Sequence, residues 1–84
     1  MLERHRLPID KIYVPVKRMK MLDPERVEAL ATDILENGQT TPISVRPEPE
    51  RDRFVLVEGL HRLEALRALG EDEVTGYLVQ ARIR

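Results

Sequence analysis

The chain has 84 residues, of which 14 are basic and 15 acidic, so its formal net charge is −1. This length is typical of one small domain, over residues 1–84, and the balanced charge argues against a domain that grips duplex DNA by itself. The chain has no cysteine, which excludes disulfides, thiolate chemistry and a cysteine zinc site. No apolar run approaches about 18 residues and no secretory leader is recognisable, so we expect a cytoplasmic protein without a membrane partner.

The N-terminal segment is basic and contains one short predicted strand. Pro8 and Pro15 bracket Ile12–Val14, which keeps this strand short or at a sheet edge. His5 precedes it in a segment that we expect to be mobile. The residues Val16–Met21 show no clear periodicity, so an irregular connection is expected there.

The first helix has recognisable signals at both ends. Asp23 is its predicted N-cap, and Pro24 occupies its first position. Gly38 is expected to end it, because glycine accepts the left-handed conformation that closes many helices. Between these ends, apolar residues follow the spacing of one buried helix face: Val27, Leu30, Ala31, Ile34 and Leu35.

Three further strands and a second helix complete the predicted domain. Ile43–Arg46 alternates between apolar and polar residues, and a turn rich in proline and charge leads to Arg53–Glu58, whose apolar run favours a central strand. The second helix covers Leu60–Leu69. The last strand covers Val74–Val79, where Gly76 indicates a bulge or a close backbone approach. The order β-α-β-β-α-β predicts an α+β fold, in which two main helices pack on a small mixed β-sheet.

The turn at Gly59 is the best candidate for a functional site. Gly59 permits a sharp strand-to-helix turn, and Leu60, His61 and Arg62 then fall on the first turn of the helix. The free N–H groups and the positive dipole end of a helix start attract anions, and Arg62 adds a planar fork suited to phosphate. This pattern predicts a phosphate cradle. The alternative is an ordinary glycine turn followed by an exposed histidine and arginine.

Other charged residues could converge on the same anion. Arg26 lies in the first turn of the first helix, where an arginine opposes the dipole, and Arg46 ends a strand. Glu58 is the candidate catalytic carboxylate, because it would sit beside a bound phosphate and could hold Mg²⁺ or a hydroxyl. The alternatives are a surface salt bridge for Arg26 and an ordinary strand-end glutamate for Glu58. No paired metal-ligand spacing such as H-E-x-x-H occurs, so no metal site made by the protein alone is expected.

The chain resembles the ParB/sulfiredoxin superfamily over nearly its whole length. The segments that carry the resemblance follow the family's order and spacing: LPIDKI, LDPERVEALATDILENG, TPISVR, FVLVEGLHRLEALRALG and VTGYLVQ. At Gly59-Leu60-His61-Arg62, ParB proteins carry G-E-R-R against nucleotide phosphates, and sulfiredoxins carry G-C-H-R against ATP. The resemblance implies a ParB/sulfiredoxin-like fold that binds ATP or CTP at this turn, with Mg²⁺ on the phosphates.

The resemblance also bears on the activity. Sulfiredoxins use the cysteine of their tetrapeptide, which is Leu60 here, so sulfiredoxin activity is excluded. Free-serine kinases carry a similar D/E-G-V-H-R stretch, but their catalytic glutamate follows the first strand, where Val14–Met21 has no acidic residue. ParB proteins continue into a helix-turn-helix domain and a dimerisation domain. DNA is therefore expected to be bound only indirectly or through further domains.

These observations lead us to expect a nucleotide-phosphate-binding ParB-like domain. It would act as a regulatory or switch module in DNA or plasmid partition or in gene regulation, with a second copy or another protein as partner. The alternative is an enzyme, either a nucleotide hydrolase or an ATP- or ADP-dependent kinase of a small molecule such as free serine. A third interpretation is a domain of this fold that mediates protein contacts alone.

Overall fold

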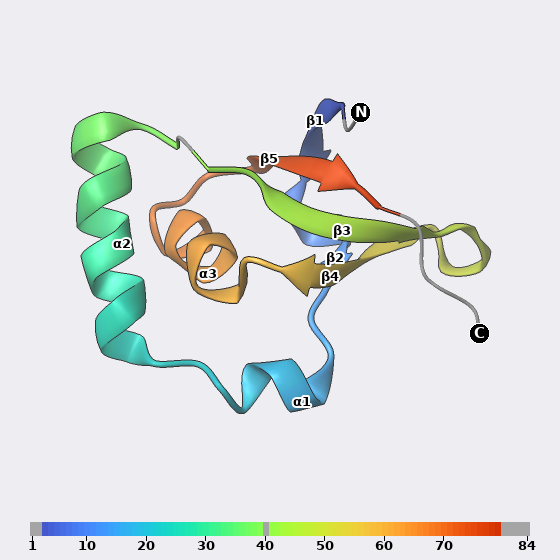
Figure 1. Ribbon diagram of the computed structural model, residues 1–84, viewed down its shortest axis with the longest axis horizontal. Coiled ribbons are helices and arrows are strands. Elements are labelled where there is room, and N and C mark those ends of the chain that lie inside the picture. Colours follow the sequence, from blue (N-terminus) through green and yellow to red (C-terminus); the bar gives the residue numbers. More distant parts are fainter. Residues whose placement is uncertain (1–2, 40, 80–84) are drawn as a thin grey trace.

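The computed structural model describes residues 3–39 and 41–79. Within them, five strands form one mixed sheet in the order β1-β5-β3-β4-β2. Figure 1 shows α2 and α3 together at the left of the sheet and the β3–β4 hairpin at the right. The elements are β1 (Arg4–Pro8), β2 (Ile12–Tyr13), α1 (Val16–Met19), α2 (Pro24–Asn37), β3 (Ile43–Glu48), β4 (Arg53–Glu58), α3 (Leu60–Ala68) and β5 (Glu73–Leu78), with short 3₁₀ turns at Ile9–Lys11 and Pro49–Arg51.

The core lies between the helices and one face of the sheet. Leu63 of α3 is fully buried, together with side chains from the central strands: Ile43, Val45 and Val74. Ile34 of α2 and Leu56 of β4 belong to the same cluster. The predicted α+β fold with a small mixed sheet and two main helices is therefore confirmed. None of the helices in the described ranges is long and apolar enough to cross a membrane.

The predicted ends of α2 are confirmed, but its predicted buried face is too wide. The Asp23 carboxylate accepts a hydrogen bond from the Glu25 N–H at 3.0 Å, and Gly38 follows the helix with φ +79°. Ile34 is buried, whereas Leu35 is 75% exposed. The contacts of α2 are mainly with α3 rather than with the sheet. A narrower stripe is enough to cover a neighbouring helix, so Leu35 is left in solvent.

The first strand was not predicted. Arg4–Pro8 forms β1, which pairs antiparallel with β5 from Arg4 opposite Tyr77 to Pro8 opposite Glu73. His5 therefore belongs to a strand and not to a mobile segment. The pairing joins the two ends of the described chain, and a strand held by so distant a partner has no local signal. The segment expected to be irregular contains the single-turn helix α1.

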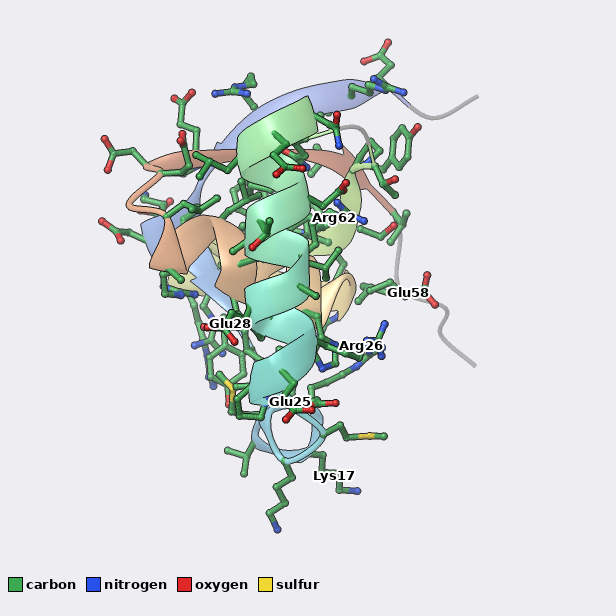
Figure 2. All side chains as sticks on the ribbon, turned by 90° about the vertical axis from the view of Figure 1, so that its left-hand side faces the viewer. Lys17, Glu25, Arg26, Glu28, Glu58 and Arg62 are labelled. Carbon is green, nitrogen blue, oxygen red and sulfur yellow. The ribbon has the colours of Figure 1, made fainter. Side chains whose placement is uncertain are left out.

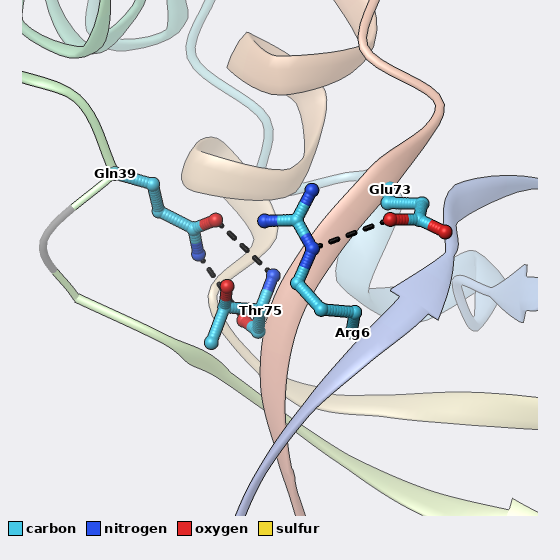
Figure 3. A network of polar contacts seen from close by, with 4 residues as sticks. All are labelled: Arg6, Gln39, Glu73 and Thr75. Atoms are coloured by element: carbon cyan, nitrogen blue, oxygen red, sulfur yellow. Dashed lines mark hydrogen bonds and ion pairs between the residues drawn. The ribbon is translucent and has the colours of Figure 1, made fainter.

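The side chain of Gln39 pairs with the backbone of β5 at a point that β3, which begins at Ile43, does not reach. Its side-chain amide accepts a hydrogen bond from the Thr75 N–H at 3.1 Å and donates one to the Thr75 carbonyl at 3.1 Å. Figure 3 shows this pair of bonds beside the Arg6–Glu73 ion pair. The amide takes the place of a neighbouring strand, so these backbone groups of β5 are satisfied. The sequence indicated only a polar loop here.

The remaining strand predictions are confirmed with small changes of bounds. β4 lies between β3 and β2, as its apolar composition predicted. Gly76 marks a close approach, because a Cβ atom there would lie 2.9 Å from Leu7 Cδ1. The register shift of the sheet lies elsewhere, between Ser44 and Val45. The last strand covers Glu73–Leu78, so it begins and ends one residue earlier than predicted.

The turn from β4 into α3 depends on Gly59. Gly59 has φ +109°, in the left-handed region, and its carbonyl accepts the hydrogen bond from the Leu63 N–H at 2.9 Å. A Cβ atom at this position would lie 2.6 Å from Ile43 Cγ2 and 3.2 Å from the Ile43 Cα. Ile43 is itself 1% exposed and cannot move aside easily. The backbone of β3 thus holds the start of α3 at the end of β4.

This contact predicts that Gly59→Ala is more destabilising than Gly70→Ala. Gly70 also has a positive φ, +80°, but no atom lies within 4 Å of its added Cβ. Both substitutions carry backbone strain of about 1–3 kcal/mol. Gly59→Ala adds overpacking of about 1–3 kcal/mol against the core. Urea unfolding of the two variants measures the difference, and equal losses would show that the Ile43 contact is unimportant.

The β3–β4 hairpin is held by a partly buried ion pair. Arg53 Nε donates to Glu48 Oε1 across the two strands. The Arg53 guanidinium lowers the pKa of the Glu48 carboxyl below its ordinary value, with smaller contributions from Arg51 and Arg46, and burial opposes the shift. Because the pKa is lowered in the folded state, the pair stabilises the fold above the ordinary pKa of glutamate. This stability is lost as the pH falls through the folded-state pKa.

We therefore expect Glu48→Gln to lower the urea midpoint at neutral pH. The difference from the unsubstituted chain should shrink as the pH falls below about 4 and vanish once Glu48 is protonated in both states. Glu50→Gln removes an exposed carboxyl from the same hairpin and should change the midpoint little at either pH. A Glu48→Gln effect that is independent of pH would contradict the assignment to this ion pair.

Candidate functional site

A hollow of about 450 Å³ opens where α3 begins. Its volume lies within the range of about 300–1,000 Å³ that is common for small-molecule sites. Its walls come from α1 and the residues after it, from the first half of α2, and from the β4–α3 turn. They are lined by Arg18, Met21, Arg26, Leu30, Glu58, Gly59, Leu60, His61 and Arg62.

The structure brings all but one of the predicted site residues to this hollow. Glu58 and the tetrapeptide from Gly59 to Arg62 supply one wall, and Arg26 reaches it from α2. Figure 2 shows Arg26, Arg62 and Glu58 on one side of α2, and Glu28 on the other. Leu60 is buried in the core, so it offers the hollow its backbone rather than its side chain.

Arg46 is the exception. It lies directly opposite Val55 in the β3–β4 register, whereas the preceding Val45 lies opposite Leu56 and points into the core. Side chains alternate between the two faces of a strand. Arg46 therefore lies on the face of the sheet away from the helices, and it does not line the hollow. The sequence placed Arg46 correctly on a strand but could not assign its face relative to the site.

Arg62, which lines the hollow, has an unsatisfied donor. Its Nη1 atom is buried, and it has no hydrogen-bond partner in the part of the chain that the structure describes. Leaving a charged donor without a partner costs more than leaving a neutral one. An anion in the hollow would provide the missing acceptor. The planar fork of a guanidinium suits two oxygens of one phosphate or carboxylate.

His61 connects the start of α3 to the start of α2. The backbone N–H of Asp23, the N-cap of α2, donates to His61 Nε2 at 3.0 Å. An accepting Nε2 is unprotonated, so the neutral ring carries its proton on Nδ1, which remains a donor. The two helix N-termini that border the hollow are thus held together by one of its own residues. The sequence predicted a donor at His61 and did not predict this link.

Arg18 was missed by the sequence analysis. It lies on α1 within a basic run that has no periodicity, and nothing in that run distinguishes it from Lys17 or Lys20. In the structure its Nη2 donates to the Val57 carbonyl, which brings α1 against the end of β4. Met21 and Leu30 are the other unpredicted lining residues, and they give the hollow an apolar wall.

The charge of the hollow is positive. Arg18, Arg26 and Arg62 line it together with a single carboxylate, that of Glu58. The N-terminus of α3 adds the partial positive charge of its backbone. Arginines, a helix N-terminus and an apolar wall are together the features of a site for an anion that also carries an apolar or aromatic part.

Comparison with known proteins agrees with this geometry. A probable chromosome-partitioning protein, ParB, of Campylobacter jejuni is 34% identical over 73 residues, which is 86% of this chain and 26% of that protein. The chain thus spans about a quarter of the length of this relative. A ParB structure from Caulobacter crescentus, complexed with CTP-γ-S, superposes with a TM-score of 0.82 at 26% identity, over 95% of this chain and 46% of that one.

Two other solved structures have a similar fold. Sulfiredoxin from Arabidopsis thaliana has a TM-score of 0.80 at 26% identity, over 94% of this chain and 86% of that one. A free serine kinase in complex with AMP has a TM-score of 0.80 at 20% identity, over 93% of this chain and 31% of that one, and at this identity it shows the fold alone. The sequence profile described as the ParB N-terminal domain matches residues 2–84. The chain therefore belongs to the ParB N-terminal domain family.

Proposed function

We propose that this chain is a nucleotide-binding ParB-type domain that holds the phosphates of its ligand at the start of α3. The observation that carries the proposal is a hollow lined by three arginines, one of which, Arg62, has a buried Nη1 atom without a hydrogen-bond partner among the described residues. A triphosphate would satisfy this donor and neutralise the local positive charge.

Each wall of the hollow has a distinct role in the proposal. The backbone N–H groups of the first turn of α3 would bind phosphate oxygens, because helix starts leave these donors free. The absence of a Cβ at Gly59 leaves that turn close to the sheet, where a larger residue would clash with Ile43. Arg62, Arg26 and Arg18 would supply the compensating charge. Met21 and Leu30 would contact the less polar part of the nucleotide.

Glu58 and Mg²⁺ fit the same arrangement. Glu58 is the carboxylate of the hollow, and Mg²⁺ in nucleotide sites is usually held by one or two carboxylates, the phosphates and water. Bound there, Mg²⁺ would offset the charge of the phosphates beside Glu58. CTP is the first nucleotide to test, since the Caulobacter crescentus ParB that superposes on this chain was solved with CTP-γ-S, and ATP is the second.

The biological role follows from the family. We propose that nucleotide binding switches a ParB-type protein between two states, in DNA or plasmid partition or in gene regulation. A second copy or another protein would respond to the change of state, and duplex DNA would be bound through domains that these 84 residues do not include. The cytoplasm is the compartment in which such a protein would meet both nucleotide and DNA.

A second candidate function is transfer of phosphate to a small molecule. The observation in its favour is the position of Glu58, which lies at the hollow directly before the proposed phosphate cradle. A carboxylate there could accept the proton of an attacking hydroxyl. The segment after β2 offers no carboxylate for this role, because α1 and the residues around it are basic or apolar.

The proposal predicts that nucleotide with Mg²⁺ stabilises the chain and that Arg62→Ala abolishes the effect. At about ten times Kd, binding should raise the unfolding free energy by about 1.4 kcal/mol and Tm by about 5–10 °C for a domain of this size. Thermal-shift measurements with CTP, ATP, GTP and ADP identify the ligand. Arg62→Lys keeps the charge but loses the fork, and it should retain only part of the shift.

Arg46→Ala is the matched control. It removes one arginine from the opposite face of the sheet and should leave the nucleotide shift unchanged. No shift with any nucleotide at millimolar concentration would overturn the proposal, and a full shift in Arg62→Ala would place the site elsewhere.

Nucleotide consumption distinguishes the switch from the kinase. If the chain is a switch, it should consume nucleotide at the same rate with and without added free serine or another amino acid, and phosphoserine should not form. A kinase should form phosphoserine in proportion to the ADP or AMP released, and Glu58→Gln should reduce that rate by about 10²-fold or more if Glu58 is its base. Release of ADP or AMP, with and without the acceptor, and mass spectrometry of the acceptor measure the two outcomes.

A further inference from the structure

The face of the sheet away from the helices carries arginines and tyrosines side by side. Tyr13 of β2 and Arg46 of β3 both lie directly opposite Val55 of β4, so the three residues form one row across the sheet. Arg4 of β1 lies opposite Tyr77 of β5 in a second row. Residues that face each other in neighbouring strands point to the same side.

The neighbours of these residues identify that side. Ile12, Val45 and Leu56 belong to the core beneath the helices, and each is adjacent in sequence to a member of the first row. Val74 and Leu78 of β5 also pack with the core, which puts Tyr77 between them on the opposite face. Because side chains alternate along a strand, both rows lie on the helix-free face. We name Arg4, Tyr13, Arg46, Arg53 and Tyr77 the sheet-face patch.

The patch contains an aromatic platform at Tyr13. The guanidinium carbon of Arg53 lies 4.0 Å from the centroid of the Tyr13 ring, in a cation–π contact. Tyr13 is still 39% exposed. Val55, between Tyr13 and Arg46, is only 6% exposed, so the long side chains around it form a closed surface. The platform is therefore fixed in place without a ligand.

The patch is also locally positive, although the whole chain has a net charge of −1. Its neighbouring carboxylate, Glu48, is paired with Arg53, and the pKa of Glu48 is lowered by Arg53, Arg51 and Arg46 together. Arg4 and Arg46 take part in none of the ion pairs formed within the described ranges. The acidic side chains Glu25, Glu28 and Glu36 belong to α2, on the other side of the sheet.

We propose that the sheet-face patch binds single-stranded nucleic acid, with bases stacked on Tyr13 and Tyr77 and phosphates on Arg4 and Arg46. Tyrosines on an open sheet face and arginines along the path between them are the two elements of single-strand recognition. The two tyrosines are three inter-strand spacings apart, about 14 Å across the sheet, so one short strand could reach both. This site is separate from the hollow at α3 and does not depend on a nucleotide there.

Other macromolecules fit this face less well. The bases of duplex DNA are stacked on each other and cannot stack on Tyr13 and Tyr77, and a chain of net negative charge gains little from phosphates alone. An acidic peptide would use the arginines but would have no use for the aromatic platform. The combination of both residue types on one face of the sheet thus favours single-stranded nucleic acid.

Fluorescence anisotropy of a labelled oligothymidine of about twelve nucleotides, with the full 84-residue chain at low salt, tests the proposal. We expect binding that weakens as salt is added. Tyr77→Ala and Arg46→Ala should each weaken it about tenfold, and Tyr77→Phe should retain it because the ring still stacks. Tyr13→Ala, at a more exposed position, provides the same test if Tyr77→Ala does not fold, as judged by circular dichroism.

Arg67→Ala and Arg62→Ala are the matched controls, since each removes one arginine from α3, away from the patch. Both should leave oligothymidine binding unchanged, and Arg62→Ala separates this site from the nucleotide hollow. The proposal is overturned if the unsubstituted chain does not bind at low salt, or if a duplex of equal length binds as tightly. The proposal is also overturned if polyglutamate binds as tightly as oligothymidine and Tyr77→Ala does not change that binding, because charge alone would then be responsible.

Discussion

The contact between the backbone of Gly59 and the side chain of Ile43 is the constraint on which both the fold and the candidate site depend. A Cβ at Gly59 would lie 2.6 Å from Ile43 Cγ2, so α3 can start this close to β3 only with glycine at the turn. The contact directs the N-terminus of α3 to the end of β4 and its apolar side into the core, where Leu63 is fully buried. One packing constraint therefore stabilises the domain and orients the free N–H groups of the helix towards the hollow.

The sheet separates two surfaces with different chemistry. On the helix side, Arg26 and Arg62 come from different helices and meet at the hollow because α2 and α3 pack against each other. On the other side, Arg46 and Tyr77 come from neighbouring strands and lie on an open face. Each strand places alternate residues on the core face and on the open face of the sheet, so a shift of one residue in register would exchange them. The close packing of β3 with β4 and β5 therefore keeps both surfaces intact.

Local signals in the sequence predicted the parts of the fold that local interactions form. Asp23 and Gly38 marked the ends of α2, because capping involves only neighbouring residues. The turn at Gly59 was predicted for the same reason. β1 was missed because it is stabilised by β5 at the far end of the described chain. Gln39 was assigned to a polar loop, since its hydrogen bonds to Thr75 join residues that no local pattern connects.

The candidate site shows the same division. The sequence by itself pointed to the candidate cradle, because Gly59, Leu60, His61 and Arg62 are consecutive and lie at the start of one helix. Only the tertiary structure decided which distant side chains join it. It added Arg18, which α1 brings to the end of β4, and it placed Arg46 on the other face of the sheet. A charged side chain carries no information about which face it will occupy until strand register and helix packing are established, and these depend on contacts between residues far apart in the chain.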